Sequence, residues 1–123
     1  MNHPAKSIRP FIGAKNYRES VLFYATLGFS VHSLRPKMSV ISVNEHLAFY
    51  LQDAYVKDWV DNTMLFLEVE DVQHHWEAMR VLGLPDKFPG VRLSSIQNND
   101  WGSEFFLHDP SGILWHFGVF KQN

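Results

Sequence analysis

The feature that most constrains this chain is an internal repeat with a spacing of 55 residues. The tripeptides at 27–29 and 82–84 read Leu-Gly-Phe and Leu-Gly-Leu, and Asn16 aligns in the same way with Asp71. In each copy an apolar stretch of strand length precedes the Asn or Asp, and a stretch of helix length follows it. A duplicated unit that cannot bury its apolar face alone must pair with its copy. The space between paired sheets is then the natural place for a ligand.

The first copy predicts one helix and four strands. Asn16 with Glu19 three residues later has the pattern of a capping box, which starts a helix. Gly28 stands where a left-handed residue ends one. Apolar stretches predict strands at residues 8–14, 30–34, 38–43 and 47–52.

The second copy repeats this order with one irregular region. We expect a strand at residues 64–69, a helix capped by Asp71 and ended by Gly83, and one strand near residues 91–96. Residues 104–108 and 113–120 predict a hairpin around Asp-Pro-Ser-Gly, which suits a type I turn. The chain is therefore interpreted as one domain, residues 1–123, with a module at about 6–52, a connector at 53–62 and a module at about 63–120.

Composition excludes several classes of protein. The 123 residues include no cysteine, so the chain has neither a disulfide nor a thiolate site. A net charge of -2 offers no basic surface for nucleic acid. No apolar run approaches the roughly 20 residues that span a bilayer, and residues 1–6 lack a hydrophobic signal segment. We therefore expect a cytoplasmic protein that binds neither nucleic acid nor membrane.

Two segments carry a resemblance to a known family. Residues 20–28 (SVLFYATLG) and residues 105–117 (FFLHDPSGILWHF), within two strand–helix–strand–strand–strand copies, resemble the vicinal oxygen chelate superfamily. That superfamily includes glyoxalase I, extradiol dioxygenases and bleomycin-resistance proteins. Residues 99–102 (NDWG) are most similar to the bleomycin-resistance branch. The resemblance implies an α+β fold, in which two βαβββ modules form curved mixed sheets with the helices outside.

Metal-dependent members of this superfamily take His, Gln or Glu ligands from the first and last strands of each module. The repeat and the hairpin match these positions to Arg9, a residue near Phe49, Met64 and His116. A protonated guanidinium cannot ligate a cation, Phe has no donor atom, and Met suits only soft metals. A single His falls short of the three ligands of a catalytic zinc site. The sequence therefore predicts no metal or other cofactor, and any divalent metal that does bind should gather its ligands around His116.

Strand alternation places every second side chain on the concave face. The inferred cavity is aromatic with a few charged members, so it can stack a flat ligand and pair with a charge on it. The sequence assigns no catalytic residue. The predicted ligand-binding residues are Arg9, Phe11, Phe49, Met64, Phe66, Trp101, Glu104, His108 and His116.

Four of these residues have a second interpretation. Arg9 could form an ion pair with Glu68 instead of contacting a ligand. His116 could be a hydrogen-bonded cavity residue, and His108 could bind the turn that follows it. Trp101, before Gly102, could close over the cavity or simply pack.

Three functions remain open at this stage. The favoured one is a small-molecule-binding protein of bleomycin-resistance type, which sequesters an aromatic or charged ligand without metal chemistry. The second is a glyoxalase- or dioxygenase-like lyase, isomerase or oxidoreductase with an altered metal site. The third is a regulatory or structural protein with a metabolite pocket. The resemblance also implies a homodimer, with cavities completed within one chain or by modules exchanged between two chains.

Overall fold

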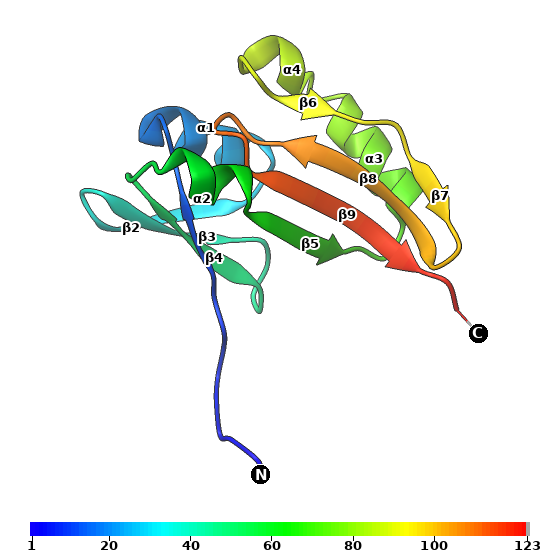
Figure 1. Cartoon of the computed structure of the whole chain (residues 1–123), viewed down its shortest axis with the longest axis horizontal. Coiled ribbons are helices and arrows are strands. Elements are labelled where there is room, and N and C mark those ends of the chain that lie inside the picture. Colours follow the sequence, from blue (N-terminus) through cyan, green and yellow to red (C-terminus); the bar gives the residue numbers. More distant parts are fainter. Residues whose placement is uncertain (123) are drawn as a thin grey trace.

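Two sheets, one from each half of the chain, form the body of the molecule (Figure 1). The computed structural model describes residues 1–122. The first sheet consists of β1 (Phe11–Gly13), β2 (Ser30–Arg35), β3 (Met38–Ser42) and β4 (Ala48–Gln52), in the order β1-β4-β3-β2. The second sheet consists of β5 (Met64–Glu68), β6 (Arg92–Leu93), β7 (Gln97–Asn99), β8 (Gly102–His108) and β9 (Leu114–Phe120). Its order is β5-β9-β8-β6, and β7 also pairs with β8.

The repeated sequence signals start and end the two longer helices, α1 (Tyr17–Thr26) and α3 (Val72–Arg80). The side chains of Asn16 and Asp71 each accept the backbone N–H three residues later, at 3.1 and 3.0 Å. Gly28 and Gly83 follow the helices with φ of 94° and 63°, a region that favours glycine. Two shorter helices are α2 (Lys57–Asp61) and α4 (Leu84–Lys87). No helix within residues 1–122 is long and apolar enough to cross a membrane.

The sequence repeat is also a repeat of strand pairing. In the first sheet β1 runs parallel to β4, with Phe11 opposite Tyr50. In the second sheet β5 runs parallel to β9, with Phe66 opposite His116. Phe11 and Phe66 are the two residues that the sequence repeat aligns, so each copy has built the same parallel pair. The predicted α+β arrangement of two strand–helix–strand modules is confirmed.

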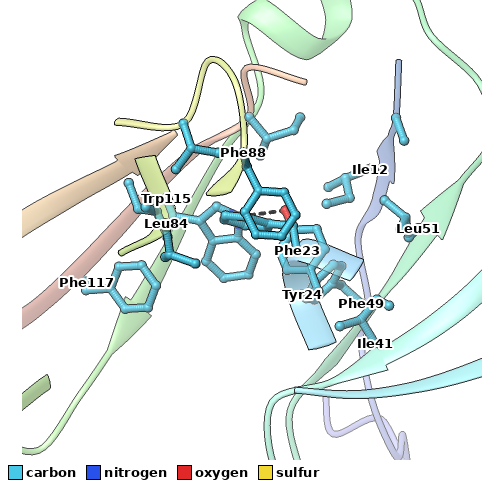
Figure 2. Close-up of a cluster of buried hydrophobic side chains, with 14 of the residues drawn as sticks. Ile12, Phe23, Tyr24, Ile41, Phe49, Leu51, Leu84, Phe88, Trp115 and Phe117 are labelled. Atoms are coloured by element: carbon cyan, nitrogen blue, oxygen red, sulfur yellow. Dashed lines mark hydrogen bonds between the residues drawn. The ribbon is translucent and has the colours of Figure 1, made fainter. Parts of the chain in front are cut away.

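A shared core joins the two halves (Figure 2). Tyr24 on α1 is fully buried, and its hydroxyl donates to Oδ2 of Asp109 at 2.7 Å and accepts Nε1–H of Trp115 at 3.0 Å. The other carboxylate oxygen of Asp109 accepts the backbone N–H groups of Ser111 and Ile113, both at 2.9 Å. Asp109 therefore stabilises its own turn and also links the hairpin of the second half to the helix of the first.

Three segments differ from the sequence prediction. Residues 8–10 lie outside β1, and the polar connector contains α2. Residues 91–96 do not form one strand, because only β6 lies within them and β7 follows separately. At Ser94 the side chain, not the backbone, accepts the N–H of Phe106 at 2.8 Å. The backbone N–H of Ser94 still donates to the carbonyl of Phe106 at 2.9 Å, so the ladder loses one of its two bonds here, and the expected strand is divided into β6 and β7.

Candidate functional site

One side of the second sheet carries most of the predicted ligand-binding residues. Helix α3 packs against β8 and β9 from the other side, and alternate residues on the strands face the core beneath it. We call the side away from α3 the open face. Its residues on β5, β8 and β9 include Met64, Phe66, Glu68, Glu104, Phe106, His108, Leu114, His116 and Phe120.

A carboxylate–imidazole pair lies in the middle of this open face. Oε1 of Glu104 is 2.8 Å from Nδ1 of His116, and the two side chains are 11% and 20% exposed. Asn99 donates to the other oxygen of Glu104 at 3.5 Å, and Nε2 of His116 is 3.5 Å from Sδ of Met64. When a neutral imidazole donates a hydrogen bond from Nδ1–H to the carboxylate, Nε2 carries no proton and can accept a hydrogen bond. A protonated imidazole would instead form an ion pair with Glu104.

Beside this pair, three aromatic side chains gather on the surface. The ring centre of Phe66 lies 6.0 Å from that of Trp101 and 5.5 Å from that of Phe120. The same ring stacks on His116 at 6.0 Å. We call Phe66, Trp101 and Phe120 the aromatic cluster, and all three are exposed, at 43%, 38% and 52%. Large exposed apolar groups that touch one another commonly mark a binding surface.

Gly118 makes room for the aromatic cluster. A Cβ at this position would lie 2.8 Å from Cζ of Phe66 and 3.2 Å from Cβ of Glu104. The absence of a side chain at Gly118 therefore lets the Phe66 ring lie across β9, next to the carboxylate–imidazole pair.

The first sheet presents a different face. Phe11 packs on Tyr50 with ring centres 4.7 Å apart. The guanidinium of Arg9 lies 5.8 Å from the centre of the Tyr50 ring and donates to its hydroxyl at 3.4 Å. Within residues 1–122 no ion pair joins Arg9 to Glu68, so the cation contacts an aromatic residue of its own half.

Between the two sheets runs a groove of about 920 Å³, within the range of small-molecule sites. Arg9 and Phe49 line it from the first half, and Phe66 and Glu68 line it from the second. Three of the predicted residues therefore meet here. Trp101 does not line this groove.

The sequence assignment near Phe49 needs a correction of one residue. Phe49 is 2% exposed and packs in the core on Tyr24 and Trp115, at ring-centre distances of 5.2 and 5.3 Å. The residue of β4 that occupies the place of His116 is Tyr50, as the matching parallel pairs show. A shift of one residue along a strand turns the side chain to the other face.

A smaller hollow of about 420 Å³ lies at the other end of the open face. His108 and Arg92 line it together with Phe106 and Leu114. Burial, followed by the charge of Arg92, lowers the pKa of His108. The predicted site residues therefore divide among the groove, the open face of the second sheet and this hollow, and Phe11 lies apart from all three, on Tyr50 of the first sheet.

The residues at the four positions that the sequence resemblance matches to metal ligands do not fit a metal ion. With Tyr50 in place of Phe49, the four positions hold Arg9, Tyr50, Met64 and His116. Only the imidazole is a usual ligand for zinc, and one imidazole with one phenol falls short of a complete ligand set for iron. Residues 1–122 contain no group of three or more His, Asp or Glu side chains placed to hold a metal.

Sequence reasoning misses three residues that the structure brings to these places. Phe120 follows Leu114, His116 and Gly118 in the alternation of β9, so this pattern could have found it. Tyr50 needed the register between β1 and β4. Arg92 gave no signal, because it lies in a two-residue strand within an irregular segment.

Comparison with known proteins shows similarity in structure alone. No protein-family model matches the sequence, and no curated protein matches it. The bleomycin-binding protein of Streptomyces verticillus, solved with copper(II)-bleomycin, has a TM-score of 0.80 at 21% identity and covers 98% of this chain and 100% of its own. The bleomycin resistance determinant of transposon Tn5 has a TM-score of 0.77 at 16% identity, covering 96% and 100%. Lactoylglutathione lyase of Agrobacterium tumefaciens has a TM-score of 0.71 at 13% identity, covering 95% and 96%.

These likenesses show the fold of the chain. It is the fold that bleomycin-binding and glyoxalase proteins share, and the resemblance noted in the sequence predicted it. Because identities stay at or below 21% in these three structures, and one fold hosts many activities, the function must be argued from the site.

Proposed function

We propose that this protein binds a flat small molecule on the open face of the second sheet and sequesters it without metal chemistry. The observation that carries the proposal is the exposed aromatic cluster beside the Glu104–His116 pair. Aromatic rings stack on flat ligands, and a largely desolvated carboxylate attracts a cationic group on the ligand. Proteins that bind bleomycin share the fold.

Sequestration of an antibiotic by this route would protect a cell in which the protein is abundant. We therefore propose an antibiotic-resistance role in the cytoplasm, and the location rests on the cysteine-free sequence. Bleomycin is the first compound to test, followed by a panel of planar aromatic compounds with positive, neutral and negative charge.

The experiment that tests this proposal is a calorimetric titration with bleomycin and the panel, repeated on Trp101→Ala. We expect this substitution to weaken binding about tenfold, because one stacked ring contributes up to about 1.5 kcal/mol. Trp59→Ala is the matched control, since Trp59 is an exposed tryptophan on α2. Equal affinity of Trp101→Ala and the unchanged protein for every bound compound would refute the proposed site.

An enzymatic alternative has one observation in its favour. Glu104 is placed to orient His116 through Nδ1, which is how a carboxylate prepares an imidazole to act as a base. Lactoylglutathione lyase also shares the fold. A lyase or oxidoreductase with an altered metal site would carry zinc, iron or manganese near one equivalent after purification without chelator. Elemental analysis distinguishes this alternative from metal-free binding.

We also propose that the protein is a homodimer, whose partner covers the exposed apolar side chains of Phe11 and Met64 on the edge strands and leaves the aromatic cluster to the ligand. Phe11 and Met64 are large apolar side chains, yet they are 54% and 64% exposed. They lie on β1 and β5, at the edges of the two sheets. An unpaired apolar edge of this kind is a ready surface for a second chain. Sedimentation at micromolar concentration should report a dimer, and a monomer would contradict this assembly.

A further inference from the structure

Arg92 and His108 stand directly opposite one another on the antiparallel strands β6 and β8. Directly opposed residues project to the same face with Cβ atoms about 5 Å apart. Both side chains line the hollow of about 420 Å³ at the β6 side of the open face. Backbone pairing therefore holds a permanent cation and a titratable imidazole at one place.

No carboxylate of residues 1–122 forms an ion pair with either side chain. Asp109 follows His108 in the chain, but it is 1% exposed and its carboxylate binds Tyr24 in the core. The positive charge of this hollow is thus left for a group from outside.

The other groups that face His108 are apolar or already paired. Leu114 is its direct neighbour on β9, and Phe106 is the next residue on the same side of β8. His116, opposite Phe106, is occupied with Glu104. The hollow therefore combines one cationic end with an apolar floor.

Charge also changes sign along this face. Glu104 and His108 lie on the same side of β8, about 13 Å apart, with Phe106 between them. The acidic residue belongs to the centre of the open face, and Arg92 and His108 belong to its other end. A ligand that spans this face meets a negative group, an aromatic ring and a positive group in turn.

We propose that Arg92 and His108 bind the carboxylate of an aromatic ligand, whose ring lies over Phe106 and Leu114. The planar guanidinium matches a carboxylate with two parallel hydrogen bonds, and the imidazole donates a third. This inference rests on the proposed function, because the hollow is one end of the same open face. It narrows the ligand class to planar monocarboxylates, including those with a cationic group at the far end.

The protonation state of His108 sets the direction in which the affinity for an anion should change with pH. Burial and the charge of Arg92 lower its pKa, so the imidazole is neutral at pH 7 and the hollow carries one positive charge. A bound carboxylate would favour the protonated imidazole. Affinity for an anion should therefore rise as pH falls from 8 to 6, and this rise should be lost in His108→Gln.

The test uses three probes of one shape: benzoate, neutral benzamide and cationic benzamidine. Each is titrated into the full-length protein at pH 6.5, and backbone amides are followed by two-dimensional NMR. We expect benzoate to shift amides of β6 and β8 and to bind at least about tenfold more tightly than benzamide, as a charge-assisted contact to Arg92 requires. Arg92→Gln should remove this preference for benzoate, whereas Arg18→Gln, on the exposed surface of α1, should keep it.

Titration with phenyl phosphate tests whether the natural ligand carries a carboxylate or a phosphate. At pH 8, where His108 is neutral, Arg92 supplies a single positive charge, so phenyl phosphate should bind no more tightly than benzoate, and a tenfold preference for phosphate would overturn the carboxylate assignment. Equal binding of benzoate and benzamide, no binding of benzoate, or an unchanged preference in Arg92→Gln would overturn the anion site itself. If the anion site fails this test but Trp101→Ala still weakens the binding of neutral ligands, the proposed function stands. Failure of the anion site and failure of the proposed function are therefore distinguishable.

Discussion

At the position where β9 carries His116 in the second sheet, β4 carries Tyr50 in the first. Two residues later, Gly118 of the second sheet corresponds to Gln52 of the first. The glycine lets an aromatic ring cross the strand. The two halves therefore share strand pairing but differ in the side chains that they present.

The core positions of the two halves differ much less. Ile12 of β1 and Leu67 of β5 occupy matching places, and both pack in the shared core. The aromatic Phe49 of β4 likewise corresponds to Trp115 of β9. The comparison teaches that packing keeps one face of each sheet largely apolar, whereas the other face is free to become a ligand site. Only the second sheet combines an exposed aromatic cluster with a hydrogen-bonded acid and imidazole.

The largest expected effect is on stability and concerns Asp109, whose carboxylate links the two halves. Asp109→Ala removes the acceptor of the Tyr24 hydroxyl and of two backbone N–H groups. Because each unpaired buried group costs about 1–3 kcal/mol, we expect a loss of roughly 3 kcal/mol or more in the free energy of unfolding. Urea denaturation followed by circular dichroism measures it.

Asp58→Ala is the control for this substitution, because the exposed side chain of Asp58 on α2 makes no hydrogen bond. It should change stability by no more than about 0.5 kcal/mol. A similarly small change in Asp109→Ala would mean that the halves are not joined through this carboxylate.

The next effect concerns the difference between the two open faces. Phe66→Ala should weaken binding of the best compound from the panel about tenfold, because it removes the ring between Trp101 and His116. Phe11→Ala, the matched change in the first sheet, should alter affinity less than about twofold, because Phe11 packs on Tyr50 of its own sheet and not on the aromatic cluster. Calorimetric titration of both variants measures these affinities. Equal losses of affinity would show that both sheets contact the ligand.

A smaller effect should be the same in both halves. Asn16→Ala and Asp71→Ala each remove one side-chain acceptor at a helix N-terminus. Each should lower the free energy of unfolding by about 1 kcal/mol. Thermal denaturation of the two variants measures the pair, and losses that differ by more than about 1 kcal/mol would break the symmetry of the caps.

The smallest effect is the pH dependence that Asp109, which links the two halves, gives to the free energy of unfolding. Burial raises the pKa of the Asp109 carboxyl above its ordinary value of 3.8. Between that value and the raised one the folded state holds the proton more tightly than the unfolded state, so this group's contribution to stability falls as pH rises through the window. Urea denaturation from pH 4 to 7 should show a slope that Asp109→Asn removes, and an identical slope in both proteins would contradict the shift.

Sequence reasoning succeeded where structure is determined locally. Asn16 and Asp71 cap their helices because a short side chain needs only the N–H groups of the next turn. It failed where long-range pairing decides the outcome. Tyr50 faces outward because of its register against Phe11, and the strand expected at residues 91–96 ends at a side-chain contact made by Ser94.

The candidate site was predictable in part for the same reason. His116 and Glu104 follow from alternation on a long hairpin, although their hydrogen bond does not. Arg92 could not be assigned to a face, because β6 has two residues and no periodicity of its own.

The measurement that tests the central claim most directly is an NMR map of the binding surface. The full-length protein, labelled with nitrogen-15, is titrated with the compound from the panel that binds most tightly. We predict that shifts concentrate on β5, β8 and β9 and on the indole N–H of Trp101, with little change at Phe11 and Tyr50. Shifts confined to the first sheet or to the helices would contradict the assignment of the second sheet's open face as the ligand site.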